Sequence, residues 1–246
     1  MKILALETSG GSADLALLES RSGESQTISA RQIPAQPRTA QSLAPAMKIA
    51  LRENNWSPAE VEMVAVATGP GSFTGLRLGV TSAKVFAYAV GARVQGVNTL
   101  EGIAWHVSRS GLSDESARIR VVMDAQRNQV FSMACFMAEL SKADYPKPSI
   151  EILDDDAWLQ SLEPGDLLAG PGLNKFGDLV NSKNLPTGVS VAPSELWRPS
   201  ATAIGQLAWR DFERGQTSAD VWSLMPRYYR QSAAEEKRAK EESGRP

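Results

Sequence analysis

One segment constrains the fold of this chain more than any other: an apolar run that enters a loop of small residues and then a long helix. The run covers 61–67, and Thr68 leads into the loop Gly69-Pro70-Gly71-Ser72-Phe73-Thr74-Gly75. A helix is predicted from there to about residue 89. N–H groups at a helix start attract anions, and Ser72 or Thr74 can cap the helix. The segment predicts an α/β fold with either an anion-binding loop or a structural turn here.

The loop differs from two widespread catalytic loops. No lysine follows Gly75, as a Walker A loop requires. Ser72 comes directly after Gly71, which excludes the pattern G-x-S-x-G. The loop alone therefore names no reaction.

The helix after the loop carries a stripe with almost no side-chain bulk, formed by Gly75, Gly79, Ala83 and Ala87. Residues at i and i+4 share a helix face, and glycine costs a helix about 1 kcal/mol relative to alanine. The stripe therefore indicates close approach of another backbone, with the protein's own sheet favoured slightly over another subunit. The opposite face, with Leu76, Val80 and the edge of Tyr88, is expected to meet a different surface.

The first hundred residues predict a mixed sheet with helices. Two apolar runs flanked by turns predict a hairpin, and a third strand, a helix, the strand described above and a last short strand follow. The predicted strands cover 3–6, 13–18, 26–32, 61–67 and 94–97. The helix begins at Thr39, with Pro45 in its first turn, and has one apolar face, formed by Leu43, Met47, Ala50 and Leu51. Ser57-Pro58-Ala59-Glu60 predicts a further helix start.

The second half is less regular. Strands are predicted at 119–123, 130–137 and 166–169, with helices at 99–107, near 175–180 and at 201–212. A short strand runs into Gly-Pro-Gly at 69–71 and again at 170–172, which is a weak sign of internal duplication. The last residues, 230–246, are charged and poor in apolar side chains, which predicts a solvated end or a partner-binding arm.

The hairpin turn Glu7-Thr8-Ser9-Gly10-Gly11-Ser12 is a second candidate anion site. Small residues let backbone N–H groups approach an anion, and Glu7 could hold a magnesium ion through water. The competing interpretation is a tight hairpin built from turn-forming residues. Residue types alone favour the hairpin.

Composition excludes several classes of protein. The 246 residues carry 26 Lys and Arg against 28 Asp and Glu, so no basic excess marks a chain that grips nucleic acid by itself. One cysteine and one histidine exclude an internal disulfide and a zinc site of the usual kind. Neither a signal peptide nor a membrane span is recognisable, and we expect a soluble cytoplasmic protein.

Isolated reactive side chains give little support for catalysis. His106 is expected to be a partly buried structural histidine, and Cys135 a buried, inert thiol. The acidic run 154–156 predicts a helix start. Asp124 is expected either to orient Arg127 or to cap a turn. No catalytic residue and no metal ligand is assigned.

These motifs resemble the TsaB (YeaZ) family of the actin/sugar-kinase/Hsp70 superfamily along nearly the whole chain. The segments that carry the resemblance are 3–9 and above all 69–79, with weaker support from 96–100, 123–127 and 228–230. The resemblance implies two ribonuclease-H-like α/β subdomains with mixed sheets flanked by helices. The first subdomain would cover 1–100 and include the pairing helices. The second, degenerate subdomain would cover 101–229, and its helix 201–212 would pack back on the first. The charged tail, 230–246, follows.

The resemblance implies a non-catalytic subunit that pairs with and activates a TsaD-type transferase in threonylcarbamoyladenosine modification of tRNA, next to the anticodon. The resemblance also implies that a TsaE-type ATPase completes that machinery. The subunit would contact tRNA only within the complex, and alone it would form a homodimer. Because the catalytic relative carries an H-x-x-x-H metal motif, the single His106 indicates the helper. The predicted pairing residues are Leu43, Met47, Ala50, Leu51, Phe73, Leu76, Gly79, Val80, Ala83 and Ala87, on helices 39–54 and 74–89.

Nucleotide binding stays open at this stage, with ATP or ADP at the partner interface as one alternative. The candidate residues are Glu7, Thr8, Ser9, Gly10, Gly69, Pro70, Gly71, Ser72 and Thr74. The chain departs from the family pattern in having Glu7 for the usual aspartate, no histidine near Thr39, and an unusual loop at 170–172. Two other functions compete: an independent ATPase or small-molecule kinase of the same fold, and a stand-alone tRNA-binding protein.

Overall fold

The computed structural model describes most of the chain. The described residues are 1–21, 23–34, 39–112, 116–140, 142, 145, 147–181, 185–216 and 220–230. The prediction of a solvated end or binding arm at 230–246 concerns residues that, apart from Arg230, lie outside this part. No helix of the described part is long and apolar enough to cross a bilayer.

The first lobe is built on a five-stranded mixed sheet in the order β3-β2-β1-β4-β5. Its strands are β1 (Lys2–Glu7), β2 (Ala13–Arg21), β3 (Glu24–Ile33), β4 (Met63–Gly69) and β5 (Arg93–Asn98). β1, β2 and β3 pair antiparallel, while β4 runs parallel to both β1 and β5. The predicted hairpin, third strand and mixed sheet are confirmed.

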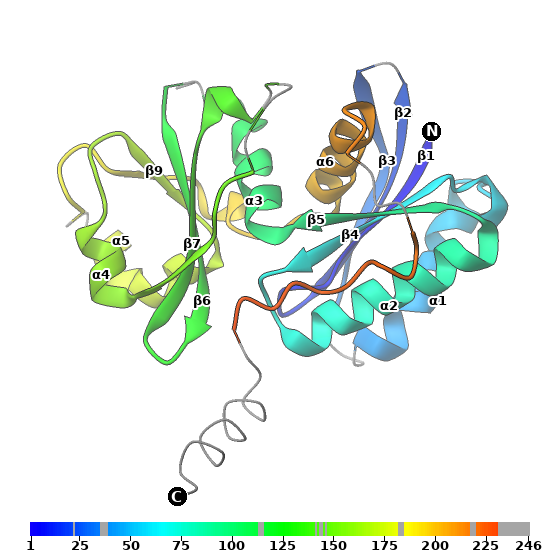
Figure 1. The fold of residues 1–246 in the computed structure, drawn as a ribbon, viewed down its shortest axis with the longest axis horizontal. Helices are drawn as coiled ribbons and strands as arrows, with labels where there is room; N and C mark the ends of the chain where they lie inside the picture. Colours follow the sequence, from blue (N-terminus) through cyan, green and yellow to red (C-terminus); the bar gives the residue numbers. More distant parts are fainter. Residues whose placement is uncertain are drawn as a thin grey trace, which may run out of the picture.

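Alternation along β1 decides how the helices cover this sheet. Leu4 and Leu6 face α1 (Thr39–Glu53) and α2 (Phe73–Val90), and Ile3 and Ala5 face α6 (Ala201–Glu213) on the other side. Successive strand residues point to opposite faces, so an uninterrupted apolar strand is buried on both. Figure 1 shows α1 and α2 on one face of the sheet and α6 on the other.

One local prediction in this lobe was wrong in detail, and another is confirmed in a short form. Pro45 lies in the second turn of α1, inside the helix, because the helix already begins at Thr39. Ser57 does form a capping box with Glu60, but only the short 3-10 helix η1 (Pro58–Glu60) follows before β4. The cap satisfies two backbone donors in a connection too short for an α-helix.

The second lobe repeats the strand order of the first. Its sheet runs β10-β9-β6-β7-β8, with β6 paired antiparallel to β7 and parallel to β9. β6 thus matches β1, β7 matches β2, and β9 matches β4. The strands are β6 (Arg118–Gln126), β7 (Gln129–Phe136), β8 (Glu151–Asp154), β9 (Asp166–Ala169) and β10 (Ser190–Val191). The fold is therefore two similar α/β units with mixed sheets, as predicted.

Helices cover both faces of the second sheet. One face packs against α3 (Thr99–Ser108), and the other against α4 (Asp155–Gln160) and the 3-10 helix η3 (Pro171–Phe176), which leads into α5 (Gly177–Asn181). The predicted helix near 175–180 is therefore 3-10 at its first two residues and α-helical from Gly177. Gly170, at the end of β9, takes the position that Gly69 holds at the end of β4, and both have positive φ, 108° and 121°. The weak sign of duplication thus corresponds to equivalent places in two equivalent sheets.

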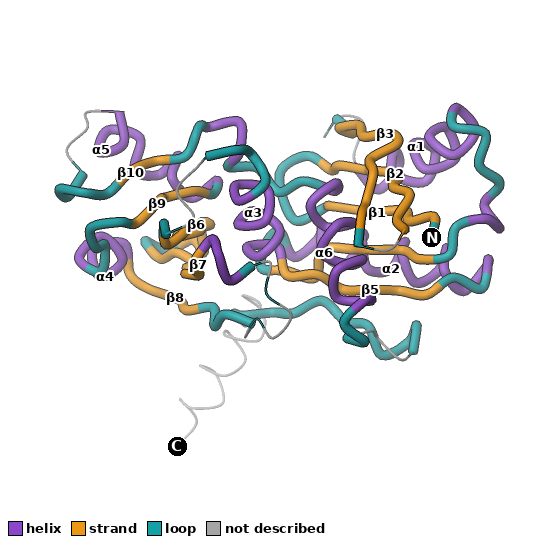
Figure 2. The backbone as a smooth tube through the Cα atoms, turned by 90° about the horizontal axis from the view of Figure 1, so that it is seen from above, coloured by secondary structure: helices purple, strands orange, loops and turns teal. Residues whose placement is uncertain are grey.

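α3 and α6 lie side by side between the sheets, as Figure 2 shows. The predicted division after residue 100 falls in the first turn of α3 and stays a prediction. After α6 the chain returns to the first lobe, where residues 221–230, here called the strap, run along α2 and then cross toward the second lobe (Figure 1).

Candidate functional site

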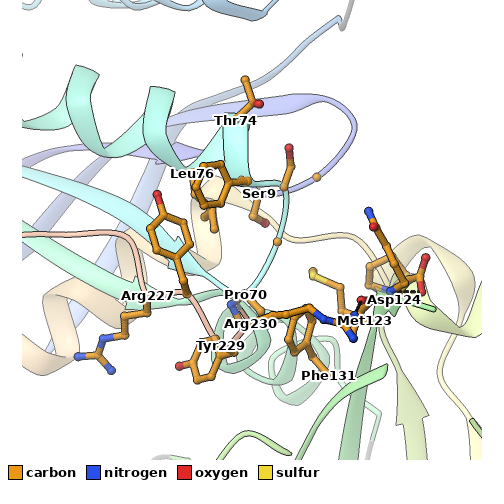
Figure 3. A pocket seen from close by; sticks show the side chains of 18 of the residues that line it. Ser9, Pro70, Thr74, Leu76, Met123, Asp124, Phe131, Arg227, Tyr229 and Arg230 are labelled. Carbon is orange, nitrogen blue, oxygen red and sulfur yellow. Dashed lines mark hydrogen bonds between the residues drawn. The ribbon is translucent and has the colours of Figure 1, made fainter. Parts of the chain in front are cut away.

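A cleft of about 690 Å³ opens between the lobes, where both predicted anion loops meet. Figure 3 shows side chains from both lobes and from the strap around it. The first lobe supplies loop residues, the second the end of β6 and part of β7, and the strap forms the third wall. The lining residues are Ser9, Gly10, Gly11, Pro70, Gly71, Ser72, Phe73, Thr74, Leu76, Met123, Asp124, Ala125, Gln126, Phe131, Pro171, Arg227, Tyr228, Tyr229 and Arg230.

The two small-residue loops are joined directly. The Ser72 N–H donates to the Ser9 carbonyl oxygen at 2.8 Å. A Cβ on Gly71 would lie 2.5 Å from the Ser9 Cβ, so only glycine permits this approach. Ser72, and not Thr74, caps α2, because its Oγ accepts the Gly75 N–H at 3.3 Å. Part of the loop's hydrogen-bonding capacity is therefore used inside the protein.

Glu7 points away from the cleft. It is buried and accepts the Ser9 N–H at 2.7 Å, and it is not among the lining residues. Burial raises its pKa to about 7, despite the bonds from Ser9. Asp14, paired with Glu7 across the hairpin, is also shifted upward in pKa by burial, and Arg198 binds it through contacts of 2.9 and 3.1 Å.

The other predicted nucleotide-binding residues divide into two groups. Thr8 and Gly69 stay out of the lining: Thr8 Oγ1 donates to the Gly75 carbonyl at 2.7 Å, and a Cβ on Gly69 would meet the Arg227 carbonyl at 2.7 Å. The structure does bring together the remaining six at the cleft, namely Ser9, Gly10, Pro70, Gly71, Ser72 and Thr74. Whether they bind nucleotide stays a prediction.

The two glycines of the small-residue stripe of α2 approach Thr8, the residue directly after β1. A Cβ on Gly75 would lie 1.9 Å from the Thr8 carbonyl oxygen, and one on Gly79 would lie 2.2 Å from Thr8 Oγ1. Leu76 and Val80, which were expected to meet a different surface from the stripe, are both buried inside the chain. Tyr88, in contrast, is 67% exposed.

The predicted pairing residues mostly face inward. Nine of them are buried in the chain, and Phe73 is partly buried under Tyr228. Helical periodicity finds the apolar face of a helix, and in α1 and α2 that face covers the sheet. Other side chains make the outward faces of these helices, above all Ile49, Val85 and Tyr88. The buried nine are Leu43, Met47, Ala50, Leu51, Leu76, Gly79, Val80, Ala83 and Ala87.

The strap is the part of the site that the sequence did not reveal. The Tyr228 ring stacks on Phe73 with centroids 4.5 Å apart, and Arg77 Nε donates to the Tyr228 hydroxyl at 3.0 Å. Asn98 Nδ2 donates to the Tyr229 hydroxyl at 3.0 Å, while the Tyr229 ring meets Phe131 edge-on. The sequence signal was the short motif 228–230, which supports the family resemblance but does not place the strap at the cleft.

Arg230 ties the strap to the second lobe. Its guanidinium donates to the Ala125 carbonyl at 2.6 Å and to Gln129 Oε1 at 2.7 Å. Nearby, Asp124 caps the β6–β7 turn, accepting the Gln126 N–H at 2.9 Å. The turn residues 126–128 all have positive φ, between 54° and 62°. Of the two roles considered for Asp124, the structure shows the cap.

The remaining reactive side chains are structural. Cys135 is buried, as predicted, and burial raises the pKa of its thiol to about 12. His106 is partly buried, which lowers its pKa. The run 154–156 does begin a helix, α4. Among the described residues, no group of three His, Cys, Asp or Glu side chains could hold a metal ion.

Comparisons with known proteins agree with this architecture. A family model described as TsaD, tRNA N6-adenosine threonylcarbamoyltransferase, matches residues 33–143. The tRNA threonylcarbamoyladenosine biosynthesis protein TsaB of Bacillus subtilis (strain 168) is 30% identical over 96% of this chain and 97% of its own length. The protein of the same name from Escherichia coli (strain K12) is 24% identical over 95% of this chain and 96% of its own.

A solved structure gives the same result for the fold. YeaZ from Pseudomonas aeruginosa superposes with a TM-score of 0.70 at 22% identity, covering 92% of this chain and 99% of that one. The match to the Bacillus subtilis protein extends over both lobes and the strap. The chain therefore belongs to the TsaB (YeaZ) family.

Proposed function

We propose that this chain is a TsaB-type subunit of the cytoplasmic machinery that makes threonylcarbamoyladenosine in tRNA, next to the anticodon. One observation carries the proposal: the match to the Bacillus subtilis biosynthesis protein extends over 96% of the chain and nearly all of that relative. The net charge of −2 favours tRNA contact within a complex over tRNA binding by this chain alone, because a protein that binds tRNA by itself needs a basic surface.

The subunit pairs with and activates a TsaD-type transferase, and a TsaE-type ATPase completes the assembly. Support for the pairing comes from the TsaD family model, which matches residues 33–143 and so includes both α1 and α2. A partner with a similar helix pair can pack against the exposed apolar side chains of these helices, Ile49, Val85 and Tyr88. Alone, the chain forms a homodimer through the same helices.

The subunit itself is non-catalytic. The chain has one histidine and cannot supply an H-x-x-x-H motif. Glu7, the acidic residue of the first loop, is turned inward and held by the Ser9 N–H. An independent ATPase or kinase has less support, because such chemistry needs an acidic group facing the bound phosphates and their metal ion.

ATP or ADP, where it binds, meets the cleft side chains of Ser9, Ser72 and Thr74 and the aromatic strap wall. The fit is partial, since the Ser72 N–H and hydroxyl are already used within the protein. A nucleotide held jointly with the partner remains compatible with this arrangement.

Depletion of the protein in its own cell tests the proposal. Threonylcarbamoyladenosine in bulk tRNA, measured by mass spectrometry of nucleosides, should fall severalfold and recover when the gene is restored. An unchanged nucleoside level would overturn the assignment. For the alternative, ATP turnover by the purified chain that disappears in Glu7→Ala would favour an independent enzyme.

A further inference from the structure

One surface of the first lobe presents large apolar side chains and positive charges together. It consists of the outer side of α2 and the adjoining strap, and we call it the α2–strap face, defined by Arg77, Lys84, Val85, Tyr88 and Trp222. Val85, Tyr88 and Trp222 are 60%, 67% and 57% exposed. The centroids of the Tyr88 and Trp222 rings lie 5.2 Å apart, so the exposed side chains of the helix and the strap form one continuous apolar patch.

The strap is fixed firmly enough to hold Trp222 in this position. Lys84 Nζ donates to the Trp222 carbonyl at 2.9 Å and to the Leu224 carbonyl at 3.1 Å. Leu224 is buried in the core of the first lobe, and the Arg227 N–H donates to the Thr68 carbonyl at 2.7 Å. Single exposed apolar residues need no explanation, but a fixed cluster of them marks an interaction surface.

Charge decides what kind of partner fits. Neither 73–90 nor 221–230 contains an aspartate or glutamate. Within the part of the chain that the structure describes, Arg77 and Lys84 contact a hydroxyl, carbonyl oxygens and aromatic rings, and neither forms an ion pair. Their positive charges are therefore available to carboxylates from outside.

We propose that the α2–strap face binds a protein surface with an apolar centre and an edge of aspartate or glutamate, and that the strap contributes Trp222 to this contact. The inference rests on the proposed pairing through α2. It adds the strap as the second part of the same contact surface. A second copy of this chain is the less suitable occupant, because a two-fold contact brings Arg77 and Lys84 against identical cations.

The test is the affinity of the purified full chain for the TsaD-type subunit of the same organism, measured by calorimetry. Trp222→Ala should weaken binding at least tenfold, as expected for a central aromatic anchor. Met225→Ala is the matched control: Met225 is on the same strap and 63% exposed, but lines a separate hollow with Gln95 and Gly96. The control should change affinity less than twofold, and both variants should melt at the temperature of the parent.

A third variant, Val85→Asp, separates failure of this inference from failure of the proposed pairing. If Val85→Asp abolishes binding while Trp222→Ala does not weaken it, the pairing holds and the role of the strap is overturned. If neither variant weakens binding, pairing through α2 is itself overturned.

Salt tests the charge argument. Affinity for the partner should fall severalfold between 50 and 500 mM NaCl, while light scattering of the chain alone should show self-association that is weaker at low salt. An affinity for the partner that does not depend on salt would contradict the proposal that the partner surface has an acidic edge. Self-association that is tighter than partner binding at low salt would contradict it too.

Discussion

Glu7 shows how a single buried side chain can make folding depend on pH. Burial of its carboxyl group raises its pKa from 4.5 to about 7. In the unfolded chain the group returns to about its ordinary value. Between these two pH values the folded protein holds a proton that the unfolded chain releases, so the free energy of unfolding falls as pH rises and levels off above pH 7.

Glu7→Gln should remove this dependence. Glutamine keeps the shape of the side chain and an oxygen that accepts the Ser9 N–H, but it cannot ionise. The variant should match the parent near pH 4.5 and exceed its free energy of unfolding by up to about 3 kcal/mol at pH 8, from a shift of about 2.5 pH units. Urea unfolding at several pH values measures the difference.

Glu60→Gln is the control for that experiment. Glu60 is exposed, and the hydrogen bond from Lys2 lowers its pKa, so its charged form is favoured by folding. This variant should gain no stability at pH 8. A Glu7→Gln curve parallel to the parent from pH 4.5 to 8 would show that Glu7 titrates alike in the folded and unfolded chains.

Gly79 illustrates a residue chosen for its lack of a side chain. A Cβ there would lie 2.2 Å from Thr8 Oγ1, which already donates to the Gly75 carbonyl. Gly79→Ala should therefore lower the free energy of unfolding by about 1–3 kcal/mol, as overpacking does. Thermal unfolding measures it, with Gly10→Ala as control, because a Cβ on Gly10 would meet nothing closer than 3.7 Å. Equal losses in both variants would contradict the close approach.

At the scale of elements, the sequence predicts those whose stability is encoded locally. The hairpin, α1, α2 and α6 have strong periodicity or turn signals, and all form. β8 has only two apolar residues, Ile152 and Leu153, between acidic ones, and β10 has two residues in all, so neither gives a recognisable apolar run. The predicted pairing residues of α1 and α2 lie on the sides of these helices that face the core, because the helical pattern marks only that face.

The strap has no helical or strand periodicity that would reveal it in the sequence. Its position depends on contacts with α2 and β4, which are distant from it in the chain. Tyr228 is its main anchor through the Phe73 ring and Arg77. Tyr228→Ala removes a stacked pair and a hydrogen bond worth about 2 kcal/mol together, and should speed tryptic cleavage after Arg227 about tenfold or more. Mass spectrometry of timed digests follows the cut, and Tyr228→Phe, which keeps the stack, should fall between. Cleavage at the parent rate would show that other contacts suffice.

At the scale of the molecule, the two lobes repeat one strand order, and the sequence held only a trace of it, Gly-Pro-Gly at 69–71 and 170–172. Equivalent strands use different apolar residues because a core requires volume and pattern more than identity. The sequence predicted only part of the cleft. Both small-residue loops were recognised as candidate sites, but the wall that the strap forms was not. A site assembled from segments of both lobes and the strap follows from tertiary packing, which local sequence does not encode.

The lobes are also joined behind the cleft by a buried charge network centred on Arg210. This α6 guanidinium binds Glu101 of α3 at 2.6 Å and Asp211 at 2.7 Å, and it donates to the Leu140 carbonyl of the second lobe at 3.1 Å. All three charged side chains are at most 9% exposed. Removal of Arg210 leaves the Glu101 carboxylate buried without this cation, which is costly, while Asp211 keeps its contact with Lys147 at 3.2 Å.

Arg210→Met should lower the free energy of unfolding by about 3–5 kcal/mol, as expected when one partner of a buried pair is lost. If the loss comes from the stranded Glu101 carboxylate, adding Glu101→Gln should restore part of it, so the double variant should be more stable than Arg210→Met alone. Urea unfolding of the parent, both single variants and the double variant completes the cycle. A double variant whose losses simply add would mean that Arg210 joins the lobes through packing and the Leu140 carbonyl, and not through its charge.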